Sequence, residues 1–314
     1  MALIQEALLM NQPLRILLQT TLLPTEEDDW TIARFSLLQE YLSSLKDEAG
    51  NPLCEITARD LAEPHQPCDR ETPENDPILT HLDRENFDEL WLFALDVGGG
   101  LSPKDCAGIT RFHQQGGGIL TARDHQDMGV SLCPLENIGC FHYFHSQQTD
   151  PDESRCRRDD VETTNITWPN YHSGNNGDYQ TIQPTEPVHD LLKNPNSPKG
   201  VIEFFPAHPH EGGVGIPEDA PHARVIARGT SKTTHRPFNL AIAAERIQDE
   251  QGNHLGRVVT QSTFHHFVDY NWEIEKGCPS FVEESPGEGM KQEPHVLDDI
   301  HTYIKNLVLW LAPA

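Results

Sequence analysis

The chain has 314 residues, of which 36% are hydrophobic, and 49 acidic against 23 basic side chains give a formal net charge of −26. Such a chain can bury a large core, while its 24 prolines and 22 glycines predict many loops. The strong negative charge repels the phosphates of nucleic acids and anionic lipids, so we expect neither class of partner.

The sequence contains no run of 18 uncharged apolar residues, so we expect no membrane-spanning helix. The first residues lack the positive region and the cleavage site of a secretory leader. The number of cysteines is odd, and no two of them form a Cys-x-x-Cys pair. This pattern is typical of reduced thiols, so we expect a cytoplasmic protein. The cysteines are Cys54, Cys68, Cys106, Cys133, Cys140, Cys156 and Cys278.

Short apolar runs and helical patterns alternate in the first half of the chain. Strands are predicted at residues 15–23, 54–60, 87–97 and 119–122. A helix with Thr25 and Asp28 as a capping box follows the first strand, and a second helix begins at Ser102 and ends before Gly116. This order is typical of a mostly parallel sheet with helices on both faces.

The pattern changes after Cys140. Residues 141–222 have few periodic segments and many aromatic and polar side chains, so we expect an ordered, loop-rich insertion that contributes to the functional site. Regular structure resumes in three strand-like runs and ends in an amphipathic helix, at residues 223–229, 238–246, 256–264 and 294–313. The sequence therefore predicts a single α/β domain over residues 1–314.

The stretch GGGILTARDHQDMG, residues 116–129, ends the fourth predicted strand at a charged corner. Ligands of parallel sheets bind beyond the carboxyl ends of the strands. We therefore expect His125 to act as a general acid or base, with Asp124 orienting its imidazole. The alternative is a core strand that merely ends on polar residues.

The stretch FFPAHPHEGG places three side chains that could carry chemistry within four residues. His208 and His210 point to the same side of an extended chain, and Glu211 follows them. Two imidazoles on one side can hold a divalent metal, or bind a substrate with Glu211 as the base. The alternative is a polar loop with coincidental histidines.

Two adjacent histidines follow the last predicted strand, in STFHHFVDYNWE. Because neighbouring side chains alternate, only one of His265 and His266 should face the edge of the sheet. We expect His265 to be catalytic and His266 to be a further candidate metal ligand, the candidate metals being Zn, Mn, Ni and Fe. His142 and His145 could also share a helical face, although their aromatic neighbours fit packing equally well.

The stretch WPNYHSGNNGDYQ combines aromatic faces with amide and carboxylate groups. This composition suits a sugar-like polyol, whose C–H face stacks on a ring while its hydroxyl groups form hydrogen bonds. The candidate substrate-binding residues are Trp168, Asn170, His172 and Asp178. A turn of the same composition is the alternative.

The order of the elements, with two motifs, resembles the ThuA-like branch of the class I glutamine amidotransferase-like superfamily. GGGILTARDH matches the glycine-rich, apolar and histidine corner of that branch, and GRVVTQSTFHH loosely matches a later stretch. The resemblance implies a flavodoxin-like sheet, with the corner at the nucleophile elbow of the superfamily, and a link to sugar utilisation. A glutaminase needs a cysteine at that elbow, whereas this chain has Asp124 and His125, and Cys133 lies eight residues further on.

We therefore expect an enzyme, a hydrolase or an isomerase, on a flavodoxin-like α/β domain with long inserted loops. It would act on a small polyhydroxylated or carbohydrate-derived substrate through its His/Asp/Glu cluster, with a divalent metal as candidate cofactor. One alternative is a non-catalytic ligand-binding protein of the same fold, and another is a cysteine amidotransferase that uses Cys133. The sequence leaves the oligomeric state open.

Overall fold

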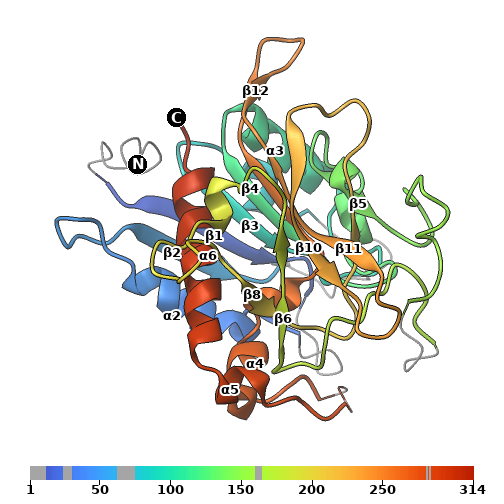
Figure 1. The fold of residues 1–314 in the computed structure, drawn as a ribbon. Helices are drawn as coiled ribbons and strands as arrows, with labels where there is room; N and C mark the ends of the chain where they lie inside the picture. Colours follow the sequence, from blue (N-terminus) through green and yellow to red (C-terminus); the bar gives the residue numbers. More distant parts are fainter. Residues whose placement is uncertain (1–11, 24–29, 62–74, 160–164, 281, 283) are drawn as a thin grey trace.

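An eight-stranded sheet with the order β2-β1-β3-β4-β14-β11-β10-β7 forms the centre of the computed structural model (Figure 1). The structure describes residues 12–23, 30–61, 75–159, 165–280, 282 and 284–314. The expected capping box at Thr25 and Asp28 lies outside the described residues, as does Cys68. The strands of the sheet are β1 (Leu14–Thr20), β2 (Cys54–Arg59), β3 (Glu89–Phe93), β4 (Gly118–Ala122), β7 (Gln183–Pro184), β10 (Ala223–Thr230), β11 (Pro237–Ala244) and β14 (Val258–Gln261).

The sheet is mostly parallel, as predicted. Strands β2, β1, β3, β4 and β14 pair in parallel, whereas β11, β10 and β7 join the far side of β14 by antiparallel pairing. Every residue of β3, β4 and β14 is buried, which explains why these strands read as continuous apolar runs. β14 comes late in the chain but pairs with β4, so two distant segments end at the same edge of the sheet.

Helices cover both faces of the sheet, and alternate strand residues pack against them (Figure 1). Trp91 and Phe93 belong to the core on one face, and Leu90 and Leu92 belong to the core on the other. The first core includes residues of α2 (Ser36–Ser44) and α6 (His295–Leu311), and the second includes residues of α3 (Pro103–Gln114). The fold is thus the flavodoxin-like α/β arrangement that the sequence predicted.

The two helices of the first half begin in different ways. α3 has the predicted cap: the Ser102 side chain accepts a hydrogen bond from the Asp105 backbone N–H. α2 begins later than expected, after the short turn η1 (Ile32–Phe35). Its first turn is capped by Asp269, which accepts hydrogen bonds from Ser36 Oγ and the Leu37 backbone N–H. This cap comes from the other end of the chain, so the local sequence could not predict it.

The loop-rich segment 141–222 is ordered by short pairings rather than by long elements. Two small sheets join β5 to β9 and β6 to β8, and β8 packs against α6.

In the described part of the chain no helix has both the length and the apolar character to cross a bilayer, and the six described cysteines are free. The remaining elements are β5 (His142–Tyr143), β6 (Tyr179–Thr181), β8 (Phe204–Pro206), β9 (Gly213–Val214), β12 (Ile247–Gln248), β13 (His254–Leu255), α4 (Asp269–Trp272), α5 (Gly289–Gln292), and the 3-10 turns η2 (Leu79–His81), η3 (Val130–Leu132), η4 (Gly139–Phe141), η5 (Asp190–Leu192), η6 (Phe264–Phe267) and η7 (Ile274–Lys276).

Candidate functional site

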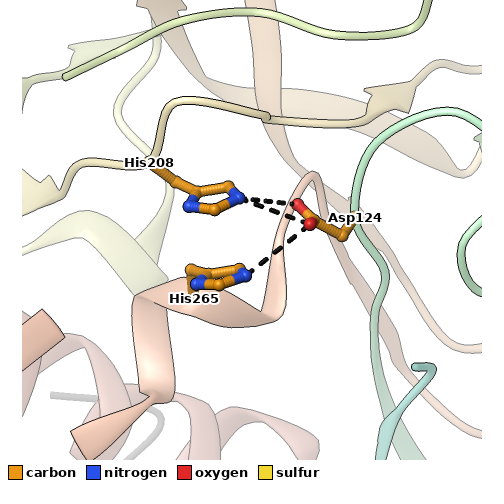
Figure 2. Close-up of side chains that lie close together, drawn as sticks. All are labelled: Asp124, His208 and His265. Carbon is orange, nitrogen blue, oxygen red and sulfur yellow. Dashed lines mark hydrogen bonds and ion pairs between the residues drawn. The ribbon is translucent and has the colours of Figure 1, made fainter. Parts of the chain in front are cut away.

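A buried carboxylate faces two buried imidazoles at the carboxyl edge of the sheet (Figure 2). His208 Nε2 lies 3.2 Å from Asp124 Oδ1, and His265 Nε2 lies 3.6 Å from Asp124 Oδ2. One potential ligand atom from each residue lies within 4.8 Å of the other two, a spacing that could hold a metal ion. We call Asp124, His208 and His265 the Asp124 group.

Three segments of the chain bring the side chains of the Asp124 group together. Asp124 follows β4, and His265 lies in η6, just after β14. Because β4 and β14 are parallel neighbours, their carboxyl ends meet. Thr263 ties the two ends together, because its hydroxyl donates to Asp124 Oδ1 at 3.0 Å and accepts from the His265 backbone N–H at 3.1 Å. His208 arrives from the segment after β8.

Hydrogen bonds on the far side of each ring fix the orientation of the imidazoles. His208 Nδ1 donates to Asn176 Oδ1 at 2.8 Å, and Tyr270 Oη lies 3.1 Å from His265 Nδ1. An amide oxygen can only accept, so the proton of neutral His208 is on Nδ1 and its Nε2 presents a lone pair to Asp124. A Tyr270 oxygen that accepts from His265 Nδ1 gives the second ring the same form. Such outer partners are typical of histidines that bind metals.

Burial sets the charge of the Asp124 group. Burial and the neighbouring His265 hold the pKa of His208 well below its usual value, and burial also lowers the pKa of His265. Burial opposes ionisation of Asp124, but His208, His125 and His265 outweigh it and keep the pKa of the carboxyl well below its usual range. Burial thus favours the neutral form of both imidazoles, which is the form that binds a metal.

Two further histidines lie against the Asp124 group. His125 Nδ1 lies 2.9 Å from Asp124 Oδ2, and the His125 side chain is 21% exposed, whereas those of His208 and His265 are 3% and 4% exposed. The His210 ring lies 5.4 Å from the rings of both His125 and His208, and its Nε2 is 3.2 Å from Glu284 Oε1. His125 is therefore the imidazole of the site that solvent reaches most easily.

A short ribbon made of residues 170–173 and 208–211 forms one wall of the site. Tyr171 and Glu211 exchange backbone hydrogen bonds, and the Ser173 backbone N–H donates to His208 O. Alternation places one set of side chains toward the Asp124 group and the other set toward the core. The site-facing set is Asn170, His172, His208 and His210, and the core-facing set is Tyr171, Ser173 and Glu211. The two histidines thus share a side, as the sequence predicted.

Glycine is required where this ribbon passes the corner. A Cβ atom at Gly212 would lie 2.4 Å from Asp124 O, which is closer than real Cβ contacts come. The Gly212 backbone N–H donates to Ser262 O at 2.9 Å. The ribbon is therefore held directly against the ends of β4 and β14.

Glu211 and His266 lie together on the core side of the ribbon, outside the Asp124 group. The Glu211 carboxylate is fully buried and accepts hydrogen bonds from Ser173 Oγ, Ser262 Oγ and Gln180 Nε2. His266 is also fully buried, with its Nε2 3.5 Å from Glu211 Oε1. One of the paired histidines thus faces the site and the other faces away from it, as predicted, although both lie in the 3-10 turn η6 and not on a strand.

The four expected substrate-binding residues are not all in one place. Asn170 and His172 are on the site-facing side of the ribbon, and Asn170 Oδ1 lies 3.3 Å from His210 Nδ1. Trp168 is half-buried beside His145, with ring centroids 5.2 Å apart. Asp178 accepts a hydrogen bond from the Gly289 backbone N–H at the start of α5, and no contact joins its side chain to the Asp124 group among the described residues.

Sequence reasoning missed the residues that support the site. Asn176 lies in the stretch WPNYHSGNNGDYQ and Tyr270 in STFHHFVDYNWE, but nothing in their spacing shows that they contact His208 and His265. Arg123 was also missed: it is fully buried and donates to the backbone oxygens of Met128 and Tyr143 at 3.1 and 2.9 Å. Burial lowers the pKa of Arg123 to about 9. These bonds hold the turn that carries Asp124 and His125.

No protein-family model matches the chain, and no curated protein sequence matches it. Similar solved structures include the glutaminase domain of Trypanosoma brucei CTPS with bound acivicin, at 13% identity and a TM-score of 0.41, covering 94% of this chain and 93% of that chain. They also include the mmIFT52 N-terminal domain, at 9% identity and a TM-score of 0.42, covering 91% and 96%. A ThuA-like protein from Parabacteroides merdae has 13% identity and a TM-score of 0.39, covering 88% and 96%. A glutaminase domain and a ThuA-like protein are thus among the similar solved structures.

Proposed function

We propose that the chain is a metal-dependent hydrolase that acts on a small polyhydroxylated or carbohydrate-derived substrate. One observation carries the proposal: two buried imidazoles, each held at Nδ1 by a partner, aim Nε2 at one buried carboxylate. Two lone pairs and a negative charge that face one another favour a cation between them. A divalent transition metal matches this donor set.

The dimensions of the Asp124 group fit such an ion. Metal–nitrogen and metal–oxygen bonds of about 2.0–2.2 Å place two ligands of one ion at most about 4.4 Å apart. The potential ligand atoms lie within 4.8 Å of one another, and the stacked rings of His208 and His265 would have to tilt so that both lone pairs point at one ion. Three protein ligands leave a position open for water or substrate, which is typical of catalytic rather than structural sites.

Residues around the Asp124 group would transfer protons and position the site. A bound metal would polarise the substrate and supply a nucleophilic water at neutral pH. His125 is held at Nδ1 by Asp124 and is partly open to solvent, so we assign it the proton transfers. We assign Glu211 a positioning role in place of a base, because its hydrogen bonds from Ser173 and Ser262 link the ribbon to the end of β14.

A cysteine mechanism has less support than a metal mechanism. Burial raises the pKa of the Cys133 thiol to about 11, whereas a nucleophilic cysteine needs a lowered pKa. An isomerase would use the same metal and the same His125, so analysis of the products separates isomerisation from hydrolysis. A protein that binds the metal but turns over no polyol, sugar or glycoside would be the non-catalytic alternative.

Metal analysis of protein produced without a histidine tag tests the proposal. After exposure to Zn, Mn, Ni or Fe and extensive dialysis, we expect about one ion per chain in the wild type. Asp124→Asn and His208→Ala should lose the ion, while His254→Ala, at an exposed position on β13, should keep it. Wild-type protein that retains none of these metals, or variants that retain as much as wild type, would overturn the proposal.

A further inference from the structure

Two polar atoms on the site-facing side of the ribbon lack partners. Asn170 Nδ2 and His172 Nδ1 are buried and form no hydrogen bond with the part of the chain that the structure describes. Asn170 is 0% exposed and His172 is 7% exposed, so water does not readily satisfy either atom. Buried polar groups are nearly always paired, and an unpaired one is costly unless a ligand completes it.

These atoms belong to the site and not to a separate region. Gln126, two residues past Asp124, donates its backbone N–H to Pro169 O at 2.9 Å, which holds the start of the ribbon against the corner. Asn170 Oδ1 is already engaged with His210 Nδ1, so the amide is oriented and only Nδ2 remains. Tyr171 packs flat on Phe238 on the core side, which leaves Asn170 and His172 on the other side.

We infer that Asn170 and His172 bind two hydroxyl groups on non-adjacent carbons of a neutral polyol. This inference rests on the proposed function for the reaction that follows binding. Residues two apart on a strand present parallel side chains about 6–7 Å apart, a span that suits two hydroxyl groups of one sugar-sized molecule. The amide N–H needs an acceptor and the imidazole can donate or accept, and a hydroxyl group can meet either need.

Charge favours a neutral polyol over an anionic one. Glu284 contacts His210, and the chain carries a net charge of −26. A carboxylate or phosphate on the substrate would be repelled by these groups. Burial adds specificity, because a site built to bond a hydroxyl group rejects an analogue that lacks it and leaves the buried atoms unpaired.

Binding of simple polyols to the full-length, Mn²⁺-loaded chain tests this inference. Glucose, sorbitol and myo-inositol are the probes, with cyclohexanol as the analogue that lacks the second hydroxyl group. Calorimetry gives Kd, and paramagnetic relaxation of the polyol protons reports their distance from the Mn²⁺. We expect at least one polyol to bind near the Mn²⁺ and cyclohexanol to bind at least about tenfold more weakly.

Two variants isolate the proposed contacts. Asn170→Asp keeps the oxygen that accepts from His210 and removes the Nδ2 donor, and His172→Phe removes the ring nitrogens. Each should weaken the polyol about tenfold or more, and Mn²⁺ content and Tm are measured in the same samples so that the polyol Kd is compared between folded, Mn²⁺-loaded proteins. Asn196→Asp, on an exposed loop, adds the same charge and should change nothing. Asn170→Ala replaces the aspartate variant if that variant does not fold.

The outcomes separate this inference from the proposed function. Wild type that binds none of the polyols at hundred-millimolar concentration, or variants that bind them as wild type does, would overturn the subsite. A chain that binds no Mn²⁺ but still loses polyol binding in Asn170→Asp would overturn the metal proposal and keep the subsite.

Discussion

The imidazole rings of His208 and His265 stack face to face, with centroids 3.5 Å apart and planes inclined by 11°. Two protonated imidazoles would repel each other at this distance, and burial lowers the pKa of each ring. Both rings are therefore neutral at neutral pH, and both turn Nε2 toward Asp124. The stack holds two potential ligands in parallel before any ion arrives.

The partners at Nδ1 are expected to set metal affinity. Tyr270→Phe and Asn176→Leu remove the groups that orient His265 and His208, so each should weaken metal binding about 10–100-fold. Competition with a chromophoric chelator measures the change, and the Co²⁺ absorption spectrum reports whether the coordination geometry is altered. Tyr179→Phe, at a half-buried tyrosine that contacts Phe204, is the matched control. Unchanged affinity in both test variants would show that these contacts serve folding alone.

His125 is expected to matter for turnover beyond any effect on metal content. His125→Ala removes the accessible imidazole beside Asp124, and loss of a general acid or base lowers kcat by about 10²–10⁴-fold. Because His125 also contacts Asp124, the metal content is measured in the same samples and kcat is compared per bound ion. His254→Ala should keep full activity. A His125→Ala protein with wild-type kcat on a substrate found by screening would contradict the assigned role.

Arg123 is expected to stabilise the turn that carries the site. Arg123→Met leaves the backbone oxygens of Met128 and Tyr143 without their donor and removes the guanidinium from the Phe144 ring, which lies 4.2 Å away. Urea denaturation should show a loss of about 2–5 kcal/mol in the free energy of unfolding. Arg123→Lys should recover only part of this loss, because an ammonium cannot reproduce the planar fork. Arg111→Met, at an exposed position on α3, should cost far less. Equal losses in Arg123→Met and Arg111→Met would remove this role.

Glu89 is expected to make stability depend on pH. Its side chain is fully buried, Trp91 Nε1 donates to one oxygen at 2.8 Å, and the other oxygen has no hydrogen-bond partner among the described residues. Burial raises the pKa of Glu89 well above its ordinary value of 4.5. The folded chain thus holds this proton more tightly than the unfolded chain, so the stabilisation is full below pH 4.5 and is lost as the pH rises toward the folded-state pKa.

Glu89→Gln removes this titration. The variant should exceed wild type in free energy of unfolding at mildly alkaline pH, and the advantage should shrink toward pH 4.5. Denaturant unfolding of both proteins across this range measures the difference. A difference that does not vary with pH would mean that Glu89 does not titrate as its burial indicates.

The elements of the fold were predictable where their signals are local. Ser102 with Asp105 caps α3, and the apolar run before Arg123 gives β4. The late start of α2 was not predictable, because its cap is Asp269, which is close only in the folded chain. The sequence likewise contains no local sign that β14 pairs with β4.

The site residues could likewise be predicted only where the sequence carries a local pattern. Alternation along an extended chain predicted that His208 and His210 lie together. It also predicted that His265 and His266 face apart, but the 3-10 turn η6, and not an extended chain, separates them. The same alternation places Glu211 on the face opposite to the two histidines, so the pattern already contained its core-facing position. Asn176 and Tyr270 have no such signal, because their roles arise only when distant segments pack against each other.

Anomalous diffraction from crystals grown with Mn²⁺ or Zn²⁺, with data collected for the metal's anomalous signal, tests the metal site most directly. We predict one strong peak at bonding distance, about 2.0–2.3 Å, from the Asp124 carboxylate and from Nε2 of both His208 and His265. Crystals that bind metal only elsewhere, with Asp124 hydrogen-bonded directly to protonated imidazoles, would contradict the proposed centre.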